Sequence, residues 1–94
     1  MLLIQSPTLF PLGKVVATPS VLEKVSERDI NDALSRHAHG DWGIVPDEDK
    51  QSNDSAVKGG DRIFSAYRSH DGVKFWIITE WDRSATTILL PEEY

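Results

Sequence analysis

A hairpin in the second half of the chain constrains its fold more than any other feature. Residues 61–70 and residues 73–81 are two runs rich in β-branched and aromatic side chains, and the pair Asp71-Gly72 separates them. Two such runs joined by Asp-Gly are typical of a β-hairpin with a two-residue type I′ turn, because both residues tolerate positive φ angles. The sequence therefore predicts a hairpin that turns at Asp71 and Gly72.

This turn also predicts the register, because a shift by one residue would move every side chain of a strand to the other face. Tyr67 should lie opposite Trp76. One face of the hairpin would then pack under helices and carry Phe64, Ala66, Val73, Phe75 and Ile77. The other face is too apolar to be left in water, and its candidate partner-binding residues are Ile63, Tyr67, Trp76 and Ile78.

The rest of the chain predicts helices before the hairpin and one strand after it. A short strand is expected over residues 13–18, a short helix begins after Thr18, and a longer helix begins after Ser26. The longer helix follows the 3.6-residue period with Ile30, Ala33, Leu34, His37 and Ala38. A third helix over residues 47–58 and a further strand over residues 85–90 complete the pattern. We therefore expect a two-layer α+β fold: a three-stranded antiparallel meander, with or without an N-terminal fourth strand, packed against two or three helices.

Length and composition exclude several classes of protein. We expect residues 1–94 to form a single α+β domain, with an extended lead-in over residues 1–12 because Pro7 and Pro11 interrupt helix and sheet. The chain has no cysteine, which excludes disulfides and thiol catalysis. A net charge of −5 argues against direct binding to nucleic acid. With no signal peptide and no long apolar run, we expect a cytoplasmic protein that does not bind membranes.

Residues suited to catalysis or metal binding do not form a convincing site. His37 and His39 lie two apart on a predicted helix, so their rings diverge and cannot share an ion, and His37 is better placed in the core. Ser69-His70-Asp71 contains the residue types of a catalytic triad, but neighbours in a strand point to opposite faces. We therefore expect no catalytic residue, cofactor or metal. The alternative is a small hydrolase or metal-dependent enzyme that uses carboxylates or histidine.

The tryptophan and tyrosine side chains are the best candidates for a binding surface, because these residues dominate interface hot spots. Trp42 and Trp81 are expected to close the edges of the core. Tyr67 and Trp76 fit two interpretations equally well: an ordinary cross-strand pair, or the centre of a surface that a partner covers. The termini, with Leu9, Phe10 and Tyr94, could instead cover this face themselves.

Several segments resemble a family of small proteins of uncharacterised activity that are encoded on bacterial plasmids and integrated mobile elements. The similarity runs from Gly13 onward and is most specific in the C-terminal stretch WIITEWDRSATTILLPEEY, residues 76–94. The resemblance implies no catalytic residue. It favours a small acidic interaction module that binds another protein, such as a host or defence component, or a second copy of itself.

Overall fold

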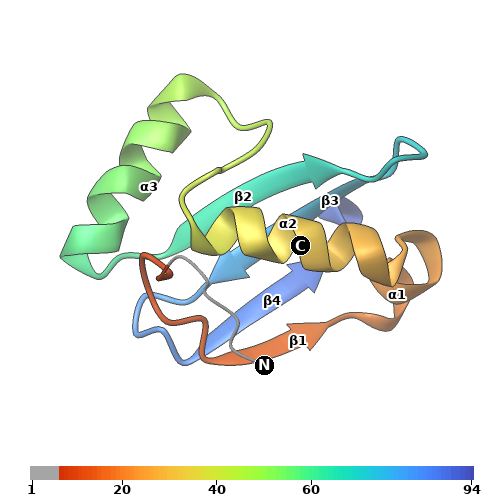
Figure 1. Ribbon diagram of the computed structural model, residues 1–94, viewed down its shortest axis with the longest axis horizontal. Coiled ribbons are helices and arrows are strands. Elements are labelled where there is room, and N and C mark those ends of the chain that lie inside the picture. The colour runs from red at the N-terminus through yellow and green to blue at the C-terminus, as the bar shows by residue number, and fades with distance from the viewer. Residues whose placement is uncertain (1–6) are drawn as a thin grey trace, which may run out of the picture.

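A mixed sheet of four strands forms the centre of the computed structural model, which describes residues 7–94 (Figure 1). The strands are β1 (Lys14–Ala17), β2 (Ile63–Arg68), β3 (Lys74–Thr79) and β4 (Ala85–Leu89), in the order β1-β4-β3-β2. β2, β3 and β4 form an antiparallel meander, and β1 pairs in parallel with β4. The α+β class is confirmed, although the sheet as a whole is not a simple meander. The first six residues of the expected lead-in lie outside the described residues.

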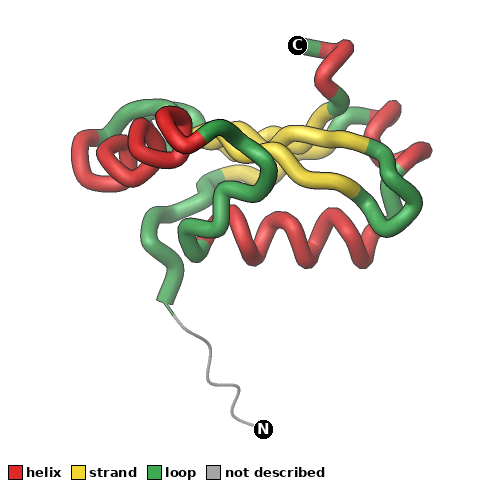
Figure 2. The backbone as a smooth tube through the Cα atoms, turned by 90° about the horizontal axis from the view of Figure 1, so that it is seen from above, coloured by secondary structure: helices red, strands yellow, loops and turns green. Residues whose placement is uncertain are grey.

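Helices occupy one face and one edge of the sheet. The elements are α1 (Pro19–Lys24), α2 (Glu27–Ala38), α3 (Asp47–Gly59) and the 3₁₀ helix η1 (Pro91–Glu93). α2 crosses one face, whereas the segment that ends in η1 lies on the opposite side of the sheet (Figure 2). α3 lies beside β2 rather than over the sheet (Figure 1). The sheet therefore has one face covered by α2 and one that no long helix of the described chain covers.

α1 and α2 begin where the sequence predicts, because their capping side chains are in place. Thr18 Oγ1 accepts a hydrogen bond from the backbone N–H of Val21 at 3.2 Å, and Ser26 Oγ accepts one from Asp29 N–H at 3.1 Å. α3 ends at Gly60, whose φ of 79° is in the left-handed region that glycine adopts without a steric penalty. Local signals thus set these helix ends.

Ser26→Ala is expected to lower the free energy of unfolding by about 1 kcal/mol, because it leaves the N–H of Asp29 without its capping acceptor. Urea unfolding of the two proteins measures the difference. An unchanged unfolding free energy would contradict this role of Ser26.

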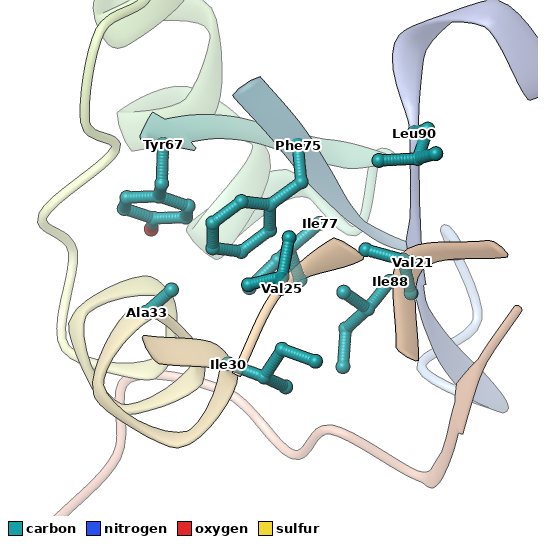
Figure 3. Close-up of a cluster of buried hydrophobic side chains, with 9 residues drawn as sticks. All are labelled: Val21, Val25, Ile30, Ala33, Tyr67, Phe75, Ile77, Ile88 and Leu90. Atoms are coloured by element: carbon teal, nitrogen blue, oxygen red, sulfur yellow. The ribbon is translucent and has the colours of Figure 1, made fainter. Parts of the chain in front are cut away.

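The main core lies between α2 and the sheet. Tyr67, Phe75, Ile77 and Ile88 project from the sheet towards side chains from the helical layer (Figure 3). That layer contributes Val21, Val25, Ile30 and Ala33. All of these side chains are buried, so the face that carries Tyr67 and Ile77 is the core face of the sheet.

The outer edge of β2 is covered by the chain itself. Asn53 of α3 bonds both backbone groups of Phe64: its Nδ2 donates to the carbonyl at 2.6 Å, and its Oδ1 accepts from the N–H at 3.1 Å. Next to it, Ile44 N–H donates to the carbonyl of Ala66, whose own N–H donates to the carbonyl of Trp42. Gly43 makes this close pairing possible, because a Cβ there would lie 2.0 Å from the carbonyl oxygen of Ala66. These contacts leave little of this edge for pairing with another strand.

The predicted hairpin register is wrong by one residue. Tyr67 lies opposite Phe75, and Trp76 lies opposite Ala66. Ser69 pairs with Val73 through a 2.9 Å hydrogen bond, so the loop has three residues, and its last residue, Gly72, has a φ of 90°. This is the pattern of a type I turn followed by a glycine bulge, which accepts Asp-Gly as readily as the two-residue turn does.

The shift exchanges the two faces of β2 while leaving those of β3 as predicted. Ile63 and Tyr67 join Phe75 and Ile77 on the core face, whereas Phe64 and Ala66 move to the face of Trp76. The expectation that Phe64 and Ala66 pack under α2 is therefore wrong. Val73, at the end of the turn, packs against the edge of the main core as expected.

Candidate interaction site

The sheet face opposite α2, here called the outer face, combines apolar and basic side chains. Strand pairing and alternation place on it Lys14, Val16, Phe64, Ala66, Arg68, Lys74, Trp76, Ile78, Thr87 and Leu89. Arg62 extends this face beyond the start of β2, where it lines a hollow together with Phe64 and Trp76. An apolar sheet face with a rim of charges is the arrangement expected of a protein contact surface.

A hollow over β2 and β3 on this face has a volume of about 290 Å³ and is lined by Arg62, Phe64, Trp76, Ile78 and Tyr94. We call it the Trp76 hollow. The rings of Phe64 and Trp76 meet edge to face with centroids 4.9 Å apart, and Trp76 makes a similar contact with Tyr94 at 5.7 Å. The walls of the Trp76 hollow are almost entirely apolar. A wider depression of about 510 Å³ beside α3 is lined mainly by polar side chains and offers no comparable anchor point.

The segment after β4 forms one wall of the Trp76 hollow. Arg62 Nη1 donates a 2.6 Å hydrogen bond to Tyr94 Oη, and the guanidinium lies 5.2 Å from the centroid of that ring. Glu93 holds η1 in place, because its Oε1 accepts from Thr18 Oγ1 and from Leu90 N–H, each at 2.8 Å. Tyr94 still has 67% of its surface exposed, so it borders the hollow without filling it.

The structure divides the four predicted partner-binding residues between the two faces. Trp76 and Ile78 lie on the outer face, Trp76 being half-buried and Ile78 forming the floor of the hollow. Ile63 and Tyr67 are in the core, with 0% and 1% of their surfaces exposed, so their predicted place on the outer face is wrong. The physical reason is the three-residue turn, which reverses the faces of β2 alone.

Sequence reasoning missed Arg62 and Phe64 as parts of this site, and it named Tyr94 only as a candidate binding residue or a cover for this face. A weak signal existed for Phe64, since a three-residue turn would have paired it with Ile78, as observed. Arg62 and Tyr94 are 32 positions apart and meet only because η1 turns the chain back over the sheet. Phe10, expected as another cover for this face, is buried on the other side, where its ring lies 5.4 Å from that of His37.

The outer face is basic in a chain that is acidic. Four of the ten lysine and arginine residues lie on it, namely Lys14, Arg62, Arg68 and Lys74. Arg68 and Lys74 are directly opposite one another, and neither forms an ion pair with any of the described residues. Arg62, in contrast, lies 4.0 Å from Glu80. Two facing cations repel each other, which makes this end of the face receptive to a negative charge.

The other two tryptophans differ from each other. Trp42 is buried, as expected, and its Nε1 donates a 3.0 Å hydrogen bond to Asp54 Oδ1. Trp81, expected to close the core, is 66% exposed in the turn between β3 and β4, so that expectation is wrong. Of the three tryptophans, Trp76 alone lines the hollow that the described residues form on the outer face.

His37 is fully buried within a chain of hydrogen bonds that crosses the core. Its Nδ1 lies 2.6 Å from Ser65 Oγ, and its Nε2 lies 2.8 Å from Thr79 Oγ1. Thr79 Oγ1 in turn lies 2.7 Å from Thr86 Oγ1, which donates to the carbonyl of Leu12 at 2.7 Å. His37 therefore links α2 to β2 and β3 directly, and to β4 through Thr79. Both ring nitrogens are engaged in these bonds, which is typical of a core histidine rather than a metal ligand.

The carbonyl of Leu12 determines which group donates in each hydrogen bond of this series. A carbonyl can only accept, so Thr86 must donate to it, and Thr79 must donate to Thr86. The hydroxyl of Thr79 is then free only to accept, which assigns the ring proton of His37 to Nε2 and leaves Nδ1 to accept from Ser65. Burial lowers the pKa of His37 to about 4, so the imidazole is neutral at neutral pH.

A second cluster of polar side chains, at the β2–β3 turn, contains potential metal ligands. Asp29, His70 and Asp71 place three potential ligand atoms within 4.8 Å of one another. However, Asp29 Oδ2 already accepts from both the N–H and the Nδ1 of His70, at 3.1 and 2.6 Å, while Asp71 accepts from the Ser69 hydroxyl. These bonds lower the pKa of Asp29 and raise that of His70. These hydrogen bonds connect the β2–β3 turn to the first turn of α2, which is a structural role.

The same contacts argue against a catalytic triad in Ser69-His70-Asp71. Ser69 bonds to Asp71, and His70 bonds to Asp29, so the serine is not linked to the imidazole that would have to activate it. The geometry gives the hydrolase alternative no nucleophile paired with a base here.

Comparisons of this chain with protein-family models, with curated proteins and with solved structures gave no match. Among the described residues, no helix is both long enough and apolar enough to cross a membrane.

Proposed function

We propose that this protein is a non-catalytic interaction module that binds another protein through the outer face of its sheet. The observation that carries the proposal is Trp76, a half-buried aromatic ring at the centre of an apolar hollow on a sheet face that no long helix of the described chain covers. Partly exposed tryptophan in an apolar recess is typical of a binding hot spot.

The dimensions of the Trp76 hollow favour a protein side chain over a small-molecule ligand. Its volume of about 290 Å³ lies at the lower end of the range for ligand pockets, and few polar groups converge in it. Such a recess matches one apolar side chain of a partner, with the surrounding sheet providing the rest of the contact.

The charges favour a different protein as the partner over a second copy of this chain. In a two-fold dimer through the outer face, the same patch would be used by both copies, which would bring two sets of the four basic residues into one interface. Like charges across an interface are unfavourable. The occupant we propose is therefore another protein.

Nucleic acid is also disfavoured as the occupant. Base stacking needs a free aromatic face, but the ring of Trp76 is already in edge-to-face contacts with Phe64 and Tyr94. The net charge of −5 adds a repulsion that a polyanion would have to overcome.

The resemblance of the C-terminal stretch to proteins of plasmids and integrated mobile elements supports the same conclusion. We propose a cytoplasmic host or defence component as the partner, because small acidic proteins of mobile elements often act by binding such components. This part of the proposal rests on analogy between sequences and not on the geometry of the site.

The test compares three proteins immobilised as bait for a bacterial lysate: wild type, Trp76→Ala and Trp81→Ala. Trp81 is the matched control, because it is exposed and does not line the hollow. A captured protein is purified and titrated calorimetrically against each bait. We expect Trp76→Ala to weaken its binding at least tenfold and Trp81→Ala to leave it within twofold.

Circular dichroism and thermal unfolding show whether Trp76→Ala remains folded. Tyr94→Ala serves as a second variant, because Tyr94 borders the hollow and is largely exposed, so its loss disturbs the fold little. A partner that binds both folded variants as tightly as wild type, or no captured protein at all, refutes the proposal.

A further inference from the structure

We infer that the segment recognised by the outer face is acidic and extended, with one apolar side chain that enters the Trp76 hollow and carboxylates that meet the basic residues around it. The inference rests on the proposed function and adds the chemistry of the partner. It is carried by the distribution of charge over the fold.

The strand residues of the outer face include basic side chains and no acid, although acids outnumber bases by fifteen to ten in the whole chain. The first turn of α3 alone carries Asp47, Glu48 and Asp49, and α2 begins with Glu27 and Asp29. The outer face instead bears Lys14, Arg62, Arg68 and Lys74. An acidic segment is drawn to the basic strand residues of this face and repelled by the acids of α2, α3 and η1, which gives both orientation and specificity.

The facing pair Arg68 and Lys74 is the clearest indication of a position that suits an anion. The two residues are exposed, directly opposite in the sheet, and without an ion pair among the described residues. Like charges directly opposite one another destabilise a strand pair, so the pairing of Arg68 with Lys74 lowers the stability of the β2–β3 hairpin. A carboxylate bound between them would remove the repulsion and form two ion pairs.

The spacing along β2 sets the pattern of the ligand. Arg62 lies at the rim of the Trp76 hollow, where its bond to Tyr94 holds it. Arg68 is four residues beyond Phe64, which corresponds to about 13 Å along a strand at about 3.3 Å per residue. An extended ligand parallel to β2 would thus carry one acid about two residues before its apolar anchor, level with Arg62, and another about four residues after it, level with Arg68, with all three side chains facing the sheet.

The experiment selects peptides from a displayed random library against the immobilised wild-type protein. We expect enrichment of an apolar residue with aspartate or glutamate about two positions before it and again about four positions after it. The best peptide, labelled with a fluorophore, is then measured by anisotropy against the double variant Arg68→Glu/Lys74→Glu. The expected result is at least a tenfold loss of affinity and, for wild type, weaker binding at higher salt.

The matched control is Lys50→Glu/Lys58→Glu on α3, which changes the net charge equally at exposed positions away from the outer face. It should leave the affinity within about twofold. Enrichment of basic residues, no enrichment, an equal loss in the control, or tighter binding of oligothymidylate than of the peptide each overturns the inference. None of these results affects capture of a partner through Trp76, so failure of the inference and failure of the proposed function are distinguishable.

Discussion

Tyr67→Ala is expected to lower the free energy of unfolding by about 3 to 5 kcal/mol, the range typical of a large aromatic side chain truncated in a core. Tyr67 is 1% exposed, its ring lies 6.0 Å from that of Phe75, and Arg36 lies 4.8 Å from the ring centroid. Its hydroxyl donates a 2.7 Å hydrogen bond to the carbonyl of Asp41. The truncation removes all of these contacts and leaves a cavity beneath α2.

Tyr67→Phe is the control, because it removes only the hydroxyl and keeps the ring. It should cost about 1 kcal/mol, the typical contribution of one hydrogen bond. Urea unfolding of the three proteins measures both differences. A cost below about 1 kcal/mol for Tyr67→Ala would place the side chain on the outer face, as the two-residue turn implied, and would refute the register.

The stability of the protein is expected to fall as the pH is lowered below neutrality, because of His37. The folded protein holds this imidazole neutral, with its pKa lowered to about 4 by burial, whereas the unfolded chain binds the proton near pH 6.5. The unfolded state therefore binds more protons between these two values. Stability is fully present above pH 6.5 and declines as the pH falls towards 4, by about 3 kcal/mol in all and about 2 kcal/mol between pH 7 and pH 5.

His37→Gln isolates this effect, because glutamine keeps one donor and one acceptor for Ser65 and Thr79 without titrating. The unfolding free energy of this variant should change much less between pH 7 and pH 5. The carboxylates with lowered pKa values, Asp29 and Asp41 among them, lose their contribution only at lower pH and do not obscure the window. An equal decline in wild type and variant would show that another group is responsible.

His70 provides a control of opposite sign. Its pKa is raised by the hydrogen bond to Asp29, so its contribution is present at low pH and is lost as the pH rises. His70→Gln should therefore make the decline towards acid somewhat steeper. A shallower decline would contradict the assignment of the two histidines.

The parts of the fold that were predicted correctly rest on local signals. Thr18, Ser26 and Gly60 mark helix ends through contacts with residues at most four positions away. The hairpin register could not be decided in this way, because Asp71-Gly72 fits both a two-residue and a three-residue loop. Ser69 favours the longer loop, since its hydroxyl bonds to Asp71 and accepts from Val73 N–H.

Half of the candidate site could be predicted, because only the residues of β2 depended on the length of the hairpin loop. Trp76 and Ile78 alternate with Phe75 and Ile77, so the division of β3 into a core face and an outer face did not depend on the turn. The division of β2 did depend on it, and it was predicted in reverse. Arg62 and Tyr94 meet through tertiary structure alone, which no pattern within either segment encodes.

Fluorine NMR of protein labelled with 5-fluorotryptophan tests the central claim most directly, because Trp42, Trp76 and Trp81 report on the core, the outer face and an exposed turn. Single substitutions assign the three resonances, and the partner recovered by capture is then titrated in. We predict that the Trp76 resonance shifts or broadens in proportion to complex formation, while those of Trp42 and Trp81 stay unchanged. A complex confirmed by size-exclusion chromatography in which the Trp76 resonance does not move would contradict the account.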